Sequence, residues 1–470
     1  MTTSLELLLT TAFIAVVSAG LSTVVGVPLG FWISRLPRRI ARTVSVLVTI
    51  PFLLPPFLVG ISVSTWTTSL DINAANGMLL ILLAHSIMNA GFIARVVSAK
   101  TLESEQVEAA MLDGAKPGQI RRLIVIPQLL PSLGSAALLV ALYSSTSYGL
   151  VLTLADGNVA TLETEIALSA LRDLDLQRAA LLALLQTLLT LGLFVWERSF
   201  ISLPASISEI QKSPLPAGRT STFVGVLFSV LVFAVLLGIM VRSNWGSGLA
   251  TNLENLGSRG TRSMLNISVV EAAGNSIRNA IVVLVIALPL AWVMAKKPGR
   301  LSPLLPAGIS PVVIGLVTLA VAGYLPRELT SSWVLLPLVQ VLFALPIAYQ
   351  ILQPARSSID KEQLQAASLD GAGSLRSSWF IELPQLRKSI AIAAAFVMLT
   401  SLGEFGAASF LAFGSNETLP IVLFQLAGRP GGDNYGMVMV TAAIYILLTA
   451  FILWLLTSPV QIQRRSRSAV

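Results

Sequence analysis

A short polar segment occurs twice in this apolar chain, and its residues are suited to recognising a partner protein. The two copies are in register, because Asp113 and Asp370 are 370 − 113 = 257 residues apart, as are the two prolines that follow them. The matched residues are Glu108, Ala109, Ala110, Asp113, Gly114 and Pro127 in the first copy, and Gln365, Ala366, Ala367, Asp370, Gly371 and Pro384 in the second. A polar segment repeated at fixed spacing predicts a docking element.

The residues before each Asp-Gly pair favour a helix, since 102–112 and 361–369 are rich in Glu, Gln, Ala and Leu. Glycine readily takes the left-handed conformation that closes a helix C-terminus, so each helix is expected to end at Asp-Gly. The paired alanines leave a surface that another protein can approach closely. We predict two short cytosolic helices that dock on a partner; the alternative is two amphipathic helices lying on the inner leaflet.

Catalytic chemistry is not indicated. The chain has one histidine, His85, and no cysteine, so neither a His-rich nor a thiolate metal centre is expected. No Gly-x-x-x-x-Gly-Lys-Ser/Thr sequence is present, and a Ser/His/Asp triad built on one intramembrane histidine is not expected. We expect no enzyme activity, no metal and no cofactor in this chain itself.

Composition places most of the chain in lipid. Of its 470 residues 54% are hydrophobic and 11% are charged, against about a quarter charged in soluble domains. The net charge of +8 is therefore attributed to cytoplasmic loops and not to nucleic-acid binding. We predict an all-α polytopic membrane protein with about eleven spans, at 5–33, 43–65, 78–98, 132–153, 179–201, 223–241, 273–295, 302–325, 333–352, 390–413 and 435–457.

Basic clusters orient these spans with the N-terminus outside and the C-terminus in the cytoplasm. Corresponding spans lie six apart, so the two halves are parallel repeats related by a pseudo-two-fold axis along the membrane normal. We predict a first core at 1–201 with its polar loop near 100–131, and a Pro- and Ser-rich cytoplasmic linker at 202–221. The second core covers 222–470, with its loop near 354–388 and one extra N-terminal span.

Three residues are candidates for a substrate pathway. Glu404 falls inside the predicted tenth span, where an ionisable side chain is costly and hence a functional candidate; the alternative is that it caps or bends the helix. Its counterpart in the first half is Ser147. His85 falls in the third span, where a packed, hydrogen-bonded histidine is the favoured interpretation. Pro56 and Pro311, at matched positions, are interpreted as helix kinks.

Glu-Ala-Ala, three residues, Gly, nine residues and Ile-x-Leu-Pro resembles the EAA signature of the membrane subunits of binding-protein-dependent ABC importers. The first copy departs from it at Ile126 and the second at Gln365. The resemblance implies that each loop is a coupling helix, docked in a cleft of one of two ATPase subunits that bind ATP and Mg. It also implies an extracytoplasmic solute-binding protein, and a multi-pass location in the inner membrane of a prokaryote.

Two cores fused in one chain, with Leu402-Gly403-Glu404-Phe405-Gly406 in the second, resemble the iron(III) and thiamine permeases of this superfamily. That resemblance implies a small solute of either type. Two other functions are alternatives to an importer permease. One is a secondary transporter with parallel repeats, driven by an ion gradient, and the other is an intramembrane enzyme. The first usually needs paired intramembrane acids or broken helices, and the second lacks a catalytic constellation.

Overall fold

The computed structural model describes residues 3–69, 77–100, 104–155, 157–200, 218–296, 304–326, 332–429 and 431–456. Within these ranges the chain is helical and contains no strand, which confirms the all-α prediction. Nine of the described helices are long and apolar enough to cross a membrane, or ten if one bent pair is counted as a single span. The predicted linker lies almost wholly outside the described residues.

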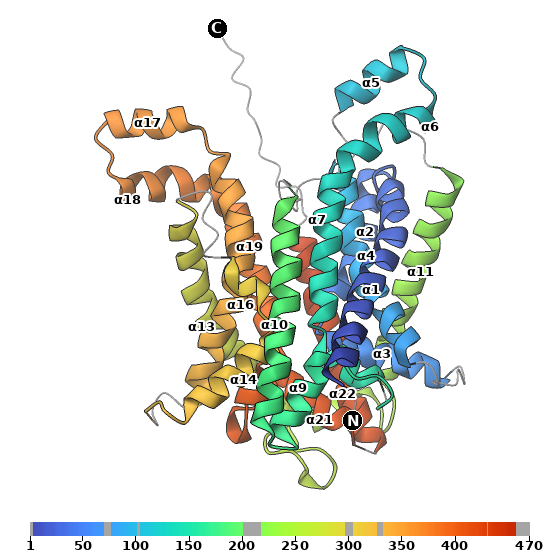
Figure 1. Cartoon of the computed structure of the whole chain (residues 1–470), viewed down its shortest axis with the longest axis vertical. Helices are drawn as coiled ribbons and strands as arrows, with labels where there is room; N and C mark the ends of the chain where they lie inside the picture. The colour runs from blue at the N-terminus through green and yellow to red at the C-terminus, as the bar shows by residue number, and fades with distance from the viewer. Residues whose placement is uncertain are drawn as a thin grey trace.

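The two halves present the same helices in the same order (Figure 1). In the first half the principal helices are α1 (Ser4–Ile33), α2 (Arg38–Leu53), α3 (Pro56–Ser69), α4 (Gly77–Lys100), α5 (Ser104–Leu112), α6 (Pro117–Ile120), α7 (Ile126–Ser145), α8 (Tyr148–Leu154), α9 (Leu162–Leu171) and α10 (Leu176–Ser199). The extra span is α11 (Arg219–Arg242), followed by the short α12 (Leu249–Asn255).

The second half repeats this order from α13 (Val269–Met294) onward. Its helices are α14 (Pro311–Ala322), α16 (Ser332–Ser357), α17 (Lys361–Leu369), α18 (Ser374–Ser377), α19 (Leu383–Gly403), α20 (Ala408–Leu411), α21 (Leu419–Ala427) and α22 (Gly432–Leu456). A one-turn helix, η3 (Leu305–Gly308), precedes α14. The internal repeat predicted from the sequence is therefore also a structural repeat.

Two predicted spans are broken, which corrects their interpretation as kinked continuous helices. The span predicted at 43–65 divides into α2 and α3, which are bent by 103°. Pro56 is the first residue of α3, where its fixed φ and missing N–H are tolerated. In the described part of the span predicted at 302–325, from residue 304 on, the helices are η3 and the 12-residue α14, which starts at Pro311. In each half the matched proline therefore begins a new helix.

The spans predicted at 132–153 and 390–413 also end early. Helix α7 stops at Ser145 and α19 at Gly403, and a short helix, α8 or α20, follows each break. The sequence Tyr148-Gly149 and its counterpart Phe405-Gly406 lie at these breaks. Both breaks coincide with a short polar stretch that the predicted spans ran across, Ser144-Ser145-Thr146-Ser147 in the first half and Gly403-Glu404 in the second.

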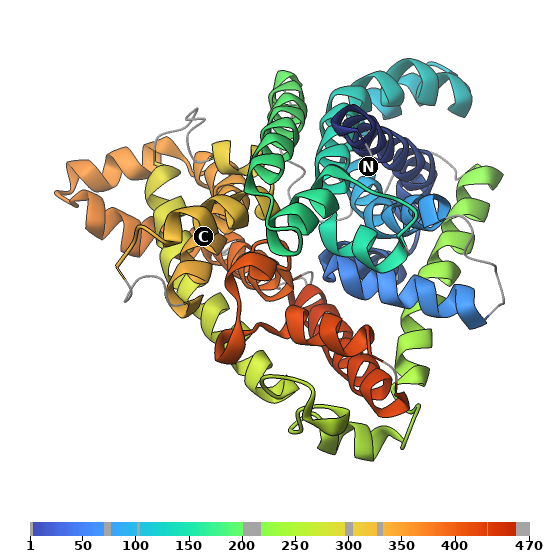
Figure 2. The ribbon, with the colours of Figure 1, turned by 60° about the horizontal axis from the view of Figure 1, so that its bottom comes forward.

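Each half has a compact helical core, and the halves exchange their last spans. Helices α1, α4 and α7 pack together in the first half, as do α13, α16 and α19 in the second. Helix α10 closes the first half but packs on η3 and α14 of the second, and α22 packs on α2 and α11 (Figure 2). This exchange joins the halves along their whole contact.

The exposed surface of the long helices is apolar. Val24 in α1 is 71% exposed and Phe223 in α11 is 68% exposed. In water, contiguous apolar surface of this kind favours aggregation or association, whereas lipid tails cover it without cost. The predicted lipid bilayer accounts for these surfaces.

The short helices α9 and α21 are held in the same way in both halves. The N–H of Leu162, which begins α9, donates to the Thr11 hydroxyl of α1 at 3.0 Å. The N–H of Leu419, which begins α21, donates to the Ser276 hydroxyl of α13 at 2.9 Å. Each first span thereby satisfies an exposed donor at a helix N-terminus.

Candidate functional site

Two short helices, α5 and α17, project from one end of the molecule, and the start of α1 lies at the opposite end (Figure 1). Helix α5 spans Ser104–Leu112 and α17 spans Lys361–Leu369, so the two helices predicted from the repeated motif are present. Each is followed by a turn and by α6 or α18, which leads back into a long span.

Both helices end in the same hydrogen-bonded turn. The N–H of Ala115 donates to the carbonyl of Ala110 at 3.0 Å, and that of Ala372 to Ala367 at 2.9 Å. Such a 6→1 bond needs a residue with positive φ, and Gly114 and Gly371 supply φ values of 78° and 79°. The predicted closure of each helix at Asp-Gly is confirmed.

The tip of each helix presents an uncovered leucine. Leu112 is 89% exposed and Leu369, its counterpart, is 87% exposed. The carboxylate-bearing Glu108 and the amide-bearing Gln365 are also exposed, one turn earlier on each helix. An apolar knob beside a polar group is the composition of an anchor for a protein groove.

A glutamine pair braces each helix against the span that follows it. Gln128 in α7 donates to Gln106 in α5 at 2.5 Å, and Gln385 in α19 donates to Gln363 in α17 at 2.9 Å. These pairs are not among the features predicted from the sequence, although both glutamines recur at the 257-residue offset. Such a bond between exposed amides contributes little stability, about 1 kcal/mol or less, but it fixes an orientation.

The return to the membrane passes through one π-helical turn in each half, η1 (Arg121–Val125) and η4 (Ser378–Glu382). Pro127 and Pro384 follow directly, in the first turn of α7 and α19. Proline lacks the N–H that would continue the α-helical ladder, so it is tolerated at a helix start. These two motif prolines therefore mark where the loop ends and the span begins.

An ion pair anchors the second loop and has no counterpart in the first. The Arg356 guanidinium at the end of α16 bonds both carboxylate oxygens of Glu382. The Ser378 hydroxyl also donates to Glu382, at 3.0 Å, and Arg356 lies over the ring of Trp292. At the positions matched to Arg356 and Glu382 the first half has Ala99 and the buried Val125, so its loop is held by apolar packing.

The two loops place their positive charges at different positions. Arg121 and Arg122 stand where the second loop has Ser378 and Trp379. Burial, together with the nearby Arg121 guanidinium, lowers the pKa of Arg35 to about 10. Arg35 follows α1 and remains charged at neutral pH, so the two loops offer partners different electrostatic surfaces.

Glu404 lies at the break after α19 and caps α20. Its carboxylate accepts the N–H groups of Ala407 at 2.7 Å and Ala408 at 3.1 Å, and the residue is 8% exposed. These bonds account for a buried carboxylate structurally, in agreement with the capping interpretation. A role for Glu404 in the pathway stays a prediction.

We expect Glu404→Ala to destabilise the protein by about 1–2 kcal/mol, because two buried N–H groups lose their acceptor. Glu404→Gln keeps one acceptor oxygen and should lose less. Thermal unfolding of both variants in one detergent measures the difference. Equal melting temperatures for the Ala variant and the unchanged chain would show that the cap contributes nothing.

The other two pathway candidates lie apart from each other. Ser147 precedes α8, is 6% exposed, and its hydroxyl has no hydrogen-bond partner among the described residues. His85 in α4 is 1% exposed, and its Nδ1 lies 3.0 Å from the Ser18 hydroxyl of α1. That contact matches the packed, hydrogen-bonded histidine favoured from the sequence. Whether either residue meets a solute stays a prediction.

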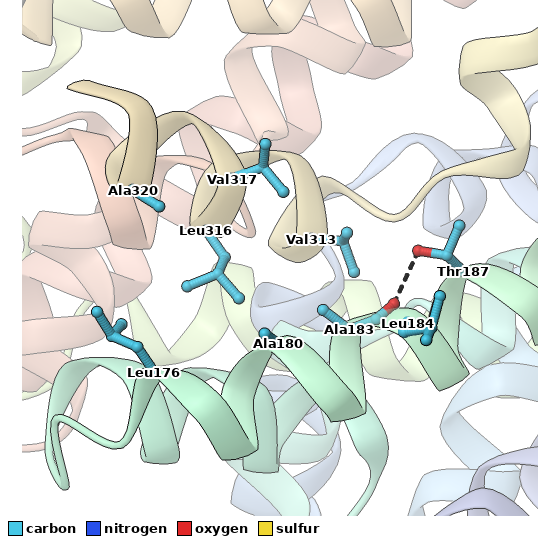
Figure 3. Close-up of a pocket in the computed structure, with 9 residues that line it drawn as sticks. All are labelled: Leu176, Ala180, Ala183, Leu184, Thr187, Val313, Leu316, Val317 and Ala320. Carbon is cyan, nitrogen blue, oxygen red and sulfur yellow. Dashed lines mark hydrogen bonds between the residues drawn. The ribbon is translucent and has the colours of Figure 1, made fainter. Parts of the chain in front are cut away.

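A cavity of about 300 Å³ lies where the halves meet, between α10 and α14 (Figure 3). Its lining is apolar apart from Thr187, whose hydroxyl donates to the Ala183 carbonyl at 2.7 Å. The other lining residues are Leu176, Ala180, Leu184, Val313, Leu316, Val317 and Ala320. This lining offers no charged group to a solute, so the cavity marks a loosely packed part of the interface between the halves.

Family membership follows from a comparison with known proteins. Residues 26–245 and 275–458 each match the family described as "Binding-protein-dependent transport system inner membrane component". The chain belongs to this family, and the double match makes it a fused, two-core membrane permease of the ABC importer type.

Relatives of this chain include the thiamine transport system permease proteins ThiP of Salmonella typhimurium and Escherichia coli. The first is 26% identical over 396 residues, covering 79% of this chain and 71% of ThiP. The second is 25% identical over 402 residues, covering 80% and 72%. The sulfate transport system permease protein CysW of Synechococcus elongatus is 24% identical and matches only 47% of this chain.

Proposed function

We propose that this chain is the permease subunit of an ATP-driven importer that moves a small, thiamine-type solute inward across the inner membrane of a prokaryote. The observation that carries the proposal is the pair of helices α5 and α17, which project at one end with matched closures and matched exposed leucines. The solute type is taken from the ThiP relatives; iron(III) is the other type that the sequence resemblance implies.

Each projecting helix serves as a coupling helix for one ATPase subunit. Leu112 or Leu369 enters the groove of the partner, and Glu108 or Gln365 makes the polar contact beside it. ATP and Mg are bound by the two ATPase copies, so this chain performs no hydrolysis. Because Gln365 lacks the charge of Glu108 but keeps an acceptor and a donor, both couplings form and their polar contacts differ.

In this proposal α5 and α17 face the cytoplasm. The start of α1 then lies outside and α22 ends on the cytoplasmic side, as the basic residues of the loops also favour. An extracytoplasmic binding protein delivers the solute to the outer end of the two halves. Helices α10 and α22 each pack on the other half. The solute path therefore opens to one side of the membrane or the other when the two halves move along this contact.

The tagged chain should be purified from its own membranes in a mild detergent and its companions identified by mass spectrometry. We expect an ATP-binding subunit at two copies per permease, and ATP-dependent uptake of radiolabelled thiamine by the reconstituted complex. A chain that emerges without any ATPase, in a detergent that preserves known ABC complexes, would contradict the coupling role. A complete complex that takes up no thiamine would contradict only the proposed solute type.

A further inference from the structure

Another buried carboxylate, Glu163, lacks the backbone hydrogen bonds that the Glu404 carboxylate accepts. Glu163 is the second residue of α9 and is 1% exposed. Neither of its carboxylate oxygens has a hydrogen-bond partner among the described residues. A buried polar group without partners is costly, and an ionised one far more so. An acid retained at such a position calls for an explanation that packing does not provide.

The neighbours of Glu163 come from both halves. Gln186 of α10 and Ser310, which caps α14, are the neutral side chains that face its carboxyl group as potential hydrogen-bond partners. Both neighbours are fully buried. Helix α9 belongs to the first half and α14 to the second, and the two helices pack on each other. Glu163 therefore lies at the junction across which the halves must move.

This junction holds more acceptors than donors. The Gln186 amide nitrogen already donates to the Ser145 carbonyl at 3.0 Å, while its oxygen has no partner among the described residues. The Ser310 oxygen already accepts two N–H groups, and its hydroxyl hydrogen is the one donor that it can offer. An ionised carboxylate only accepts. A ligand that stabilises the ionised form of Glu163 here therefore brings N–H donors, positive charge or both.

Aromatic rings from both halves flank the same place. The Tyr148 phenol is within electrostatic reach of Glu163. Its ring stacks on Phe405, its counterpart in the repeat, with centroids 5.4 Å apart and planes 21° apart. Phe57 and Phe424 pack on Phe405 with centroids at 5.6 and 5.3 Å. Ring faces attract cations and stack on flat rings, so these side chains favour the same ligand as the carboxylate.

We propose that Glu163, with the Gln186 oxygen and the Tyr148–Phe405 pair, forms the site in the translocation path that receives a flat organic cation carrying N–H groups. This inference rests on the proposed function and deepens it, since thiamine is a molecule of that class. The site is closed in this structure, where Glu163 is buried and the two rings stack on each other. The role is one-sided, because the residue matched to Glu163 in the second half is Pro420.

The test compares Glu163→Gln with Glu165→Gln in the complete complex, reconstituted with its ATPase and binding protein. Glu165 lies on the same helix and pairs with Arg178 at 2.5 Å, so its replacement controls for the loss of one carboxylate from α9. We expect E163Q to lower the amount of radiolabelled thiamine taken up per ATP hydrolysed at least tenfold, with basal ATPase activity within twofold. The control should keep both values within twofold.

Uptake by E163Q within twofold of the unchanged complex would overturn the proposal and leave Glu163 as a packed, neutral acid. Should E163Q fail to assemble, Glu163→Asp decides instead, because it keeps the charge but withdraws it by one methylene. We expect E163D to assemble and to lose at least threefold in uptake, and unchanged uptake would overturn the proposal. If the unchanged complex takes up no thiamine, the result contradicts the solute type of the proposed function. It then also contradicts the ligand proposed for Glu163.

Discussion

Replacing both Gly114 and Gly371 with valine is expected to abolish solute-stimulated ATP hydrolysis and uptake while leaving the amount of protein in the membrane unchanged. Both glycines have φ near +80°, where a side chain costs about 1–2 kcal/mol per residue and a β-branched one more. An added Cβ at either position would meet no atom within 4 Å. The penalty is thus conformational, and it falls on the turn that positions the exposed leucines.

The same loops supply the control. Gly118 and Gly373 also have open space around an added Cβ, and neither has a positive φ. The double variant G118V/G373V should keep coupled ATPase activity within about threefold, since it lacks the backbone penalty of about 1–2 kcal/mol per site. Solute-stimulated hydrolysis that survives in G114V/G371V would refute the role of the two turns.

Glu382→Gln is expected to be the most destabilising single change at the second loop. The side chains of Arg356 and Glu382 are 13% and 7% exposed, and removing one partner leaves the other charge buried and unpaired. Such a loss costs about 3–5 kcal/mol. We expect a lower melting temperature and weaker ATPase binding, because η4 and α17 lose their anchor on α16. Thermal unfolding and copurification of the ATPase measure the two effects.

The first half provides the rescue. Arg356→Ala combined with Glu382→Val copies the matched residues Ala99 and Val125. Removing both charges avoids an unpaired one, so the double variant should be more stable than E382Q or R356A alone. If the two single effects simply add in the double variant, the ion pair is not what holds this loop.

The repeat could be predicted from the sequence because its signal is local. The Asp-Gly pairs, the prolines and their 257-residue offset specify two helices whose ends the structure reproduces at Leu112 and Leu369. The breaks at Ser145 and Gly403 are marked only by a short polar stretch, Ser144–Ser147 or Gly403-Glu404, which a continuous membrane helix can also accommodate. The sequence predicts helix kinks at Pro56 and Pro311, whereas in the structure each proline begins a new helix. A proline marks where a helix can start, and tertiary packing decides by how much the chain bends there.

In the candidate site, too, some residues could be predicted from the sequence and others could not. The docking residues follow from the sequence, whereas the status of the buried acids depends on contacts between segments far apart in the chain. The sequence presents Glu404 as an isolated intramembrane charge, and the structure supplies its partners three and four residues further along the chain. Glu163 is not among the residues singled out from the sequence, and the structure buries it at the junction. Only the neighbours in the folded structure show that Glu404 is a hydrogen-bonded cap and that Glu163 is not.

The packing of α22 on α2 has a consequence for biosynthesis. About 380 residues separate the end of α2 from the start of α22, and at the usual speed of translation the ribosome needs roughly 20–80 s to make them. During that time the side of α2 that will contact α22 has to be shielded by lipid, by α11 or by an insertase. A nascent chain arrested before α22 should therefore be degraded faster than the finished one, although its first core is already complete in sequence.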